Sequence, residues 1–355
     1  TGRDIIAGSI HKSPLFFGLD STLAELFAET RQSEVSPRFS EPVAATASGN
    51  NHGLCSANPM NTGICFPGSN VIAVNENRSA NGETFLAVNA HQPWTGPVAW
   101  YEAHVHSEEG WDMVGSLFPG MPVLAHGHNR DLGWGFTVNN ADRTDVFVLE
   151  MNPDNPNQYR FDGEWRELER RPAPISVRLL GRLRITIEEE VLWSVYGPVV
   201  RQDHGTYAVR YVGMGRAGIF EHLYRMNKAT NFAEWSAAME TLEMPTFNTG
   251  YADREGNIFY VYNGLLPIRD PHYDWQLYLP GNTSETLWTE TLPFADLPQV
   301  LNPASGFVVN TNHTPFAATL DPENPDPDDF SPTLGIETYL NNRAMRALTL
   351  FGEDP

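Results

Sequence analysis

The first candidate for chemistry is Ser69, which stands in the stretch GICFPGSNVIAVN between Gly68 and Asn70. Irregular, proline-containing sequence precedes it, and an alternating apolar segment predicts a strand directly after it. The junction is either an ordinary transition from loop to strand or a place where the chain is cut. Cleavage before a serine creates a new α-amine with a pKa near neutrality. Such an amine can take the hydroxyl proton, which is the chemistry of an N-terminal nucleophile.

Two histidine pairs offer a different chemistry. His104 and His106 form one H-x-H pair, and His126 and His128 form a second. Residues i and i+2 of a strand face the same way, so each pair could present two imidazoles to one zinc ion. Nearby carboxylates that could complete such a site are Glu102, Glu108 and Asp112. The pattern indicates a zinc metallohydrolase as an alternative. No G-x-S-x-G motif marks a Ser-His-Asp hydrolase of the α/β type.

The composition limits what these residues can serve. The chain has 355 residues, of which 41% are hydrophobic, enough for a substantial core. Its formal charge of −21 argues against a nucleic-acid partner and against an anionic membrane surface. No apolar run approaches the length that spans a bilayer. The sequence begins TGRDII without a signal peptide, which indicates a processed or partial chain.

The elements that must position these residues are mostly strands. Segments rich in β-branched and aromatic residues, separated by turn signals, predict strands at 69–75, 83–91, 99–106, 144–151, 175–180, 183–195, 206–213, 256–264 and 306–312. Helices are fewer, and their spacing and caps predict them over 19–30, from Asn231 and from Asn341 to a glycine. Strands with helices set apart favour an α+β fold of sheet layers over a βαβ alternation.

Two irregular regions leave alternatives open. Cys55 and Cys65 close a small disulfide loop if the protein is exported, or they stay as unlinked thiols. The Pro- and Asp-rich segment 321–332 is an exposed loop or a loop beside a metal.

Several motifs, in order and with consistent spacing, resemble the penicillin acylase family of N-terminal nucleophile hydrolases, and most of all its acyl-homoserine lactone acylase branch. They follow the Gly-Ser-Asn junction as NAHQP (89–93), WYEAHVHSEEGWDMVGSLFPGMPVLAHGHN (100–129), LGWGFTVN (132–139), TDVF (144–147), YADREGNIFYVYNG (251–264), NPASGFVVNTNHTP (302–315) and NNRAMRAL (341–348). The resemblance implies an αββα sandwich of two stacked, mostly antiparallel sheets, truncated at both ends. Residues 1–68 would be the end of an α chain plus a spacer, and 69–355 the first part of a β chain.

The resemblance also implies roles for residues at the cleavage point. Autocatalytic cleavage of a zymogen between Gly68 and Ser69 would make Ser69 the nucleophile and its α-amine the base. His91 lies 22 residues further on (91 − 69), where the family has a His or Gln that contacts the amine and the nucleophile.

Four further roles follow from the same resemblance. The backbone N–H of Val138 and the side-chain amide of Asn312 would hold the oxyanion. Arg343 would orient Asn312. Asp142 and Asp145 fall where many members bind calcium, a hard cation that prefers oxygen ligands, so the resemblance implies a structural calcium ion whose further ligands come from elsewhere. The alternative is that the Asp pair caps a turn. The chemistry itself needs no cofactor.

The function implied is hydrolysis of the amide bond of a small N-acyl substrate, either an acyl-homoserine lactone or a penicillin-like compound. Quorum quenching or antibiotic metabolism would be the context. Trp94, Val98 and Trp100 are expected to line an apolar acyl pocket. The family implies an α–β heterodimer after processing and a periplasmic or secreted location. An inactive acylase-like binding domain is the remaining alternative, served by the many aromatic residues.

Overall fold

The computed structural model of the protein describes residues 68–180 and 183–353, and the main body contains two of its sheets. The seven-stranded sheet has the order β18 (Gln299–Leu301), β16 (Ile258–Tyr262), β15 (Asn248–Asp253), β6 (Leu132–Thr137), β5 (His126–His128), β4 (Trp111–Leu117) and β3 (Tyr101–Ser107). The three-stranded sheet has the order β19 (Phe307–Asn310), β1 (Ser69–Val74) and β2 (Phe85–Ala90). Every strand pair in these two sheets is antiparallel.

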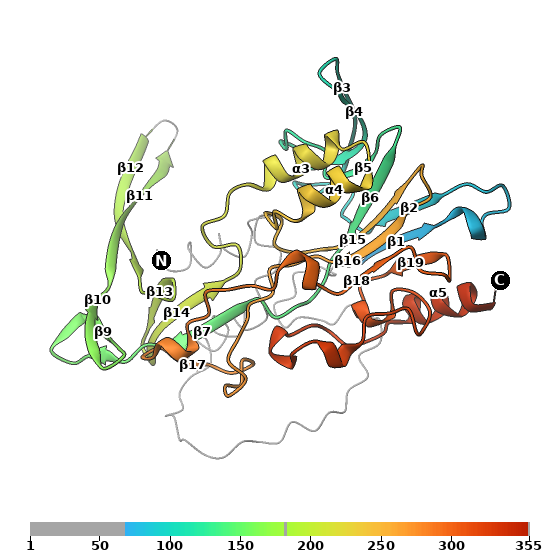
Figure 1. The fold of residues 1–355 in the computed structure, drawn as a ribbon. Coiled ribbons are helices and arrows are strands. Elements are labelled where there is room, and N and C mark those ends of the chain that lie inside the picture. Colours follow the sequence, from blue (N-terminus) through green and yellow to red (C-terminus); the bar gives the residue numbers. More distant parts are fainter. Residues whose placement is uncertain (1–67, 181–182, 354–355) are drawn as a thin grey trace.

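Two other sheets form the opposite end of the molecule (Figure 1). A six-stranded sheet has the order β11 (Glu169–Leu180), β12 (Leu183–Trp193), β13 (Pro198–Gln202), β14 (Gly205–Tyr211), β7 (Thr144–Val148) and β17 (Leu279–Pro280). A small sheet has the order β10 (Glu164–Glu167), β9 (Asn155–Phe161) and β8 (Met151–Asn152). The long β11–β12 hairpin extends away from the rest of the chain, and β17 and β7 pair in parallel.

Helices cover both outer faces of the main body. Helices α3 (Ile219–Lys228) and α4 (Phe232–Met239) lie on the seven-stranded sheet, and α5 (Asn342–Glu353) lies beside β19 (Figure 1). Strands β1 and β2 contact β6 and β15, so the two sheets are stacked. The order is therefore helices, sheet, sheet, helix, which confirms the expected αββα layering and the mostly antiparallel α+β class.

Glycines let the two sheets approach closely. A Cβ atom built on Gly135 of β6 would lie 2.4 Å from a methyl carbon of Val88, and one on Gly250 of β15 would lie 2.5 Å from a methyl carbon of Val71. Real Cβ atoms do not come so near their neighbours, so larger residues at these positions would force the sheets apart. This close packing holds β1, which begins with Ser69, against the seven-stranded sheet.

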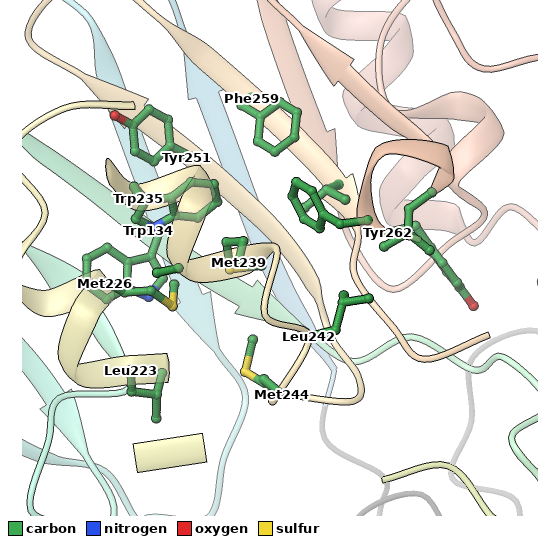
Figure 2. Packing of buried hydrophobic residues seen from close by; sticks show 14 of the residues in the cluster. Trp134, Leu223, Met226, Trp235, Met239, Leu242, Met244, Tyr251, Phe259 and Tyr262 are labelled. Carbon is green, nitrogen blue, oxygen red and sulfur yellow. The ribbon is translucent and has the colours of Figure 1, made fainter. Parts of the chain in front are cut away.

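The main core lies between that sheet and its helices (Figure 2). Trp235 of α4 is fully buried and its ring lies 4.6 Å from that of Tyr251 on β15. Asn231 caps α4, because its side chain accepts a hydrogen bond from the backbone N–H of Glu234. The helix predicted from Asn231 is therefore confirmed, and its apolar side anchors β15 behind the site.

Several local predictions differ from the structure. Helix α3 was not expected, and its first turn has only Gly218 at the cap position, without a side-chain cap. The last helix passes Gly352 and ends at Glu353. Segment 321–332 is mostly exposed, as its loop alternative predicts, and contains one short 3-10 helix, Pro327–Asp329. The helix predicted over 19–30 and the cysteines at 55 and 65 lie outside the described residues. No helix within the described ranges is both long and apolar enough to cross a membrane.

Candidate active site

Strand register brings three of the predicted site residues together. Ser69 pairs with Ala90 of β2, so His91, the next residue, lies opposite Gly68. Val71 pairs with Asn310 of β19, and extending that register by two residues places Asn312 opposite Ser69. Residues more than 240 positions apart in the sequence therefore meet at one end of β1, where they flank a serine that is only 4% exposed.

Ser69 is held by hydrogen bonds on both sides of its backbone. Its N–H donates to Oδ1 of Asn312 at 2.5 Å, and its carbonyl oxygen accepts from Nη1 of Arg343 at 2.5 Å. Arg343 also donates to Oδ1 of Asn70 at 2.6 Å. Gly68 is still joined to Ser69, so this peptide N–H stands in for the α-amine that cleavage would release. The position of that nitrogen is thus fixed before any cleavage occurs.

The Asn312 amide has one orientation that satisfies its neighbours. Its Oδ1 accepts from Ser69 and from Nη2 of Arg343, the latter at 3.0 Å. Its Nδ2 must then face the other way, where it donates to the carbonyl oxygen of Val138 at 2.9 Å. An amide NH₂ carries two hydrogens, so one remains for a second acceptor. Asn312 has φ +66°, a left-handed conformation that Asn tolerates better than most residues.

Two other asparagines support this arrangement. Asn310 accepts a hydrogen bond from the backbone N–H of Asn312 at 2.9 Å and a second from the hydroxyl of Thr137. Asn341 donates to the carbonyl oxygens of Thr311 and Asn312 at 2.7 and 3.1 Å. Oδ1 of Asn341 also accepts from the N–H of residue 344, at the start of α5. Asn341 therefore fixes the helix that carries Arg343 relative to the loop that carries Asn312.

His91 contributes both its backbone and its ring. Nε2 lies 2.7 Å from Oδ1 of Asn89, an acceptor, and 3.4 Å from Nδ2 of Asn70, a donor; the shorter contact favours the proton on Nε2. Nδ1 is then the unprotonated nitrogen, and a Cβ atom built on Gly68 would lie 3.0 Å from it. Burial, and secondarily the positive charge of Arg343, lower the pKa of His91 below its usual value. The ring is therefore a neutral acceptor beside the Gly68–Ser69 bond at pH 7.

The Gly68 carbonyl group is oriented as well. Its oxygen accepts from the backbone N–H of His91 at 2.9 Å and from Oγ of Ser69 at 2.7 Å. A side chain at position 68 would be crowded, because its Cβ would lie 2.9 Å from Nη2 of Arg343. Glycine is thus the residue that lets Arg343 reach both Ser69 and Asn312.

Ser69 opens on a cavity of about 1510 Å³. Val138, Asn312 and Arg343 also line it, and one part of its wall is aromatic. The aromatic residues nearest the seven-stranded sheet are Trp100, Phe118, Phe136 and Phe247. The lining thus combines polar groups around Ser69 with a group of aromatic rings.

The structure corrects the predicted acyl-pocket residues. Trp100 lines the cavity, but Trp94 and Val98 do not, and Trp94 is 98% exposed. The chain leaves β2 after Ala90 and makes bends and a turn before β3 begins at Tyr101, so the side-chain alternation of a strand does not continue there.

Asp142 and Asp145 lie together but share an arginine. Arg269, whose side chain is fully buried, has Nη2 2.9 Å from Oδ2 of Asp145 and Nη1 3.4 Å from Oδ2 of Asp142. Burial raises the pKa of Asp145 to about 6, and Arg269 opposes that rise, so the carboxylate is charged at pH 7. Its Oδ1 is buried and has no hydrogen-bond partner, which would suit a cation.

These residues do not by themselves make a calcium site. Calcium takes 6–8 oxygen ligands. Within the described ranges no group of three or more His, Cys, Asp or Glu residues is placed to hold a metal ion. The donor set of two carboxylates with a guanidinium between them falls short, so calcium here stays a prediction.

The four histidines of the zinc alternative do not converge. His104 on β3 pairs with Val114 on β4, which pairs in turn with His128 on β5. The two H-x-H pairs are therefore two strand spacings apart, roughly 9–10 Å. His104 and His106 contact Asp112 at the surface, at 2.7 and 3.4 Å. His126 is buried instead, so a shared zinc site is wrong for these residues.

Some residues of the site were not predicted. Four residues with contacts described above were not among the predicted site residues: Asn70, Asn89, Asn341 and Arg269. Asn341 had a local signal, since it precedes a predicted helix. Asn70 follows Ser69 directly, and Asn89 stands two residues before His91. The hydrogen bonds of these two asparagines become evident only once β1 and β2 are paired.

Comparisons with known proteins agree with this geometry. A family profile described as penicillin amidase matches residues 14–354. Penicillin G acylase of Escherichia coli is 30% identical over 255 residues, which is 70% of this chain and 29% of that protein. Acyl-homoserine lactone acylase PvdQ of Pseudomonas putida is 29% identical over 211 residues, which is 57% of this chain and 27% of that protein.

A solved structure matches as well. A thermostable penicillin G acylase from Alcaligenes faecalis superposes with a TM-score of 0.64 and 26% identity, covering 80% of this chain and 49% of that one. The chain thus spans less than half the length of each of these relatives. A profile match over nearly the whole sequence, together with the same fold, shows that the chain belongs to the penicillin amidase family.

Proposed function

We propose that the protein hydrolyses the amide bond of a small N-acyl substrate through an acyl-Ser69 ester, after its own chain is cut between Gly68 and Ser69. One observation carries the proposal. A single amide, that of Asn312, contacts the nitrogen of Ser69 with its oxygen and lies beside Val138 with its nitrogen, at the wall of a large cavity. An N-terminal nucleophile needs this combination of a held amine and an oxyanion donor.

The cut begins with attack of Ser69 Oγ on the carbonyl carbon of Gly68. The carbonyl oxygen accepts from the N–H of His91, and that contact stabilises the charge that develops there. Loss of the Ser69 nitrogen from the tetrahedral carbon leaves an ester and frees the α-amine. Water then hydrolyses the ester to a carboxylate at Gly68. His91 Nδ1, unprotonated and adjacent, takes the proton of Oγ during the attack and returns it to the Ser69 nitrogen as that nitrogen leaves.

Substrate hydrolysis repeats the attack on an external amide. The α-amine of Ser69 takes the proton from Oγ as Oγ attacks the acyl carbon. The oxyanion accepts from the N–H of Val138 and from the free N–H of Asn312. The amine then protonates the leaving nitrogen, and water hydrolyses the acyl ester. Arg343 acts by holding Asn312 in the required orientation. No cofactor enters these steps.

The cavity supports an apolar acyl group. Its aromatic wall near Trp100, Phe118 and Phe136 favours a hydrocarbon or aryl group over a charged one. Two relatives are named for acyl-homoserine lactones and for penicillin G. We propose these two leaving groups, homoserine lactone and a β-lactam nucleus, as the candidates. Action on the first would quench a quorum signal, and action on the second would belong to antibiotic metabolism.

Assembly and location complete the proposal. Cleavage at Gly68–Ser69 would leave two chains, which we expect to stay together as a heterodimer. We also propose a periplasmic or secreted location, which rests on the family likeness alone.

The test is hydrolysis by the full-length protein of acyl-homoserine lactones and phenylacetyl amides, measured as release of the primary amine. Ser69→Ala is the comparison. We expect wild type to release amine from at least one substrate class and the variant to lose about 10³-fold or more in rate. A Ser69→Ala protein within tenfold of wild type would exclude Ser69 as nucleophile. No amine release from any substrate would favour the inactive binding-domain alternative.

A further inference from the structure

Polar groups without partners line the aromatic part of the cavity. His126, Trp100 and Gln92 all line it. Nε1 of Trp100 and Oε1 of Gln92 are buried without a hydrogen-bond partner. His126 is only 8% exposed, and no residue in the described ranges hydrogen-bonds to its ring. These groups are surrounded by rings, since the imidazole lies 4.3 Å from Trp100 and Trp100 stacks on Phe118 at 4.1 Å.

Packing alone does not account for His126. Two other buried histidines of this protein are tied into the structure. The ring of His313 lies 3.1 Å from the N–H of Thr311 and 3.0 Å from the carbonyl oxygen of Ala317. In His222 one ring nitrogen, Nδ1, lies 2.9 Å from the hydroxyl of Thr241, and only Nε2 is without a partner. Burying a polar group without a partner costs free energy, so structural histidines are normally bonded in this way. His126 has no such partner, although the cavity beside it has room for one.

The position of His126 relative to the nucleophile is set by two neighbouring strands. Gly127 of β5 pairs with Trp134 of β6. The ring of Phe136 lies 6.5 Å from the imidazole, and Val138 follows two residues later, about 7 Å along the chain. An acyl group whose carbonyl oxygen lies at Val138 must therefore pass Phe136 before it reaches His126. This geometry places the polar groups at the level of the far end of such an acyl group and not of its first carbons.

The chemistry of the site points to a hydroxyl group. Burial lowers the pKa of His126 to about 4, so the ring is neutral at pH 7 and offers one donor and one acceptor. Trp100 Nε1 offers only a donor. A hydroxyl both donates and accepts, so it can satisfy both neighbours. A carboxylate would meet only neutral groups in His126, Trp100 and Gln92, and a methyl group would leave both polar groups unsatisfied.

Resting on the acylase function proposed above, we propose that His126 and Trp100 form a polar anchor that selects acyl groups carrying a hydroxyl at their far end. The substrate class is an acyl group that is apolar beside the carbonyl and hydroxylated distally. The 4-hydroxyphenylacetyl group and long-chain acyl groups with a terminal hydroxyl have this pattern. A site built to hydrogen-bond a hydroxyl rejects the analogue that lacks it, because its own polar groups are then left unpaired.

The experiment compares matched pairs of amides of one amine. These are phenylacetyl against 4-hydroxyphenylacetyl, and octanoyl against 8-hydroxyoctanoyl. We expect wild type to favour the hydroxylated member of at least one pair by tenfold or more in kcat/KM. His126→Phe should abolish or reverse that preference, while His126→Gln, which keeps a hydrogen-bonding group, should retain part of it. His128→Phe places the same change at an exposed residue of the same strand and should leave the preference unchanged.

The outcomes separate this inference from the proposed function. Wild type that hydrolyses both pairs without a preference for the hydroxyl overturns the anchor and leaves the acylase intact. If no amide is hydrolysed, titration calorimetry with the free acids still tests the anchor. Phenylacetate binding as tightly as 4-hydroxyphenylacetate would then overturn it, and tenfold tighter binding of the hydroxylated acid, lost in His126→Phe, would support it. Thermal melts of each variant establish that it is folded.

Discussion

Asn312→Asp separates the two halves of one amide. Aspartate has the same shape and tolerates the left-handed backbone at φ +66°, so the backbone cost is small. One carboxylate oxygen can keep the contacts that Oδ1 makes with Ser69 and Arg343. In the wild-type protein Nδ2 donates a hydrogen bond to the carbonyl oxygen of Val138, and in the variant the second carboxylate oxygen takes the place of Nδ2. The variant therefore loses the oxyanion donor while the held nitrogen stays in place.

The expected loss of kcat in Asn312→Asp follows from the role of Asn312 as an oxyanion donor. Removal of one oxyanion donor costs about 10²–10³ in kcat, or about 2.7–4 kcal/mol of transition-state stabilisation. A negative oxygen beside the developing oxyanion adds repulsion, so the loss should reach the upper part of that range. KM should change much less, because the ground-state carbonyl oxygen is a weaker acceptor than the oxyanion. The assay is steady-state amine release, with intact mass to establish that the chain is still cut.

A matched control comes from the same substitution elsewhere. Asn81→Asp changes an exposed turn residue ahead of β2 and should leave kcat unchanged. If Asn312→Asp is cut normally and keeps kcat within threefold of wild type, Asn312 is not an oxyanion donor, and the reasoning from its amide orientation fails.

Three further predictions follow from the packing and the charges. Gly68→Val should slow cutting of the chain, because the valine side chain would displace Arg343. The rate is measured as intact mass over time, and cutting at the wild-type rate contradicts the crowding described at Gly68. Gly135→Ala should lower the free energy of unfolding by about 1–3 kcal/mol in urea titrations. Val88→Ala in the same chain should recover part of that loss, since the added methyl then has room. Burial lowers the pKa of His222 to about 4, so between pH 6.5 and 4 the unfolded state binds more protons than the folded state. The free energy of unfolding therefore falls by up to roughly 3 kcal/mol as the pH drops through that range. Asp145, whose pKa is raised, changes the free energy of unfolding in the opposite direction. The test is therefore whether His222→Gln loses less free energy of unfolding than wild type between pH 7 and 4.5; an equal loss in both proteins contradicts the prediction.

The sequence predicted the elements whose signals are local. The Asn231 cap and its apolar spacing identified α4, and β1 was expected directly after Ser69. Helix α3 has neither a side-chain cap nor a strong start signal, so local patterns do not predict it. Trp94 and Val98 are an aromatic and an aliphatic residue that follow His91, and residue type alone suggested a pocket there, whereas the chain leaves β2 after Ala90 and bends before β3 begins.

Local sequence patterns could not predict which distant strands pair with one another. The site depends on β1 lying between β2 and β19, and β19 is about 240 residues away along the chain. Spacing alone could not place Asn312 against Ser69, and the family resemblance supplied that expectation. The histidine pairs illustrate the reverse case. Their spacing suits a metal, but β4 lies between their strands and keeps them apart.

The most direct test of the central claim is the intact mass of the full-length protein, wild type beside Ser69→Ala. Wild type should appear as two chains whose masses place the cut between Gly68 and Ser69, and the variant should stay whole. Wild type that remains a single chain would have no free α-amine at Ser69, which contradicts the proposed base and with it the acylase mechanism.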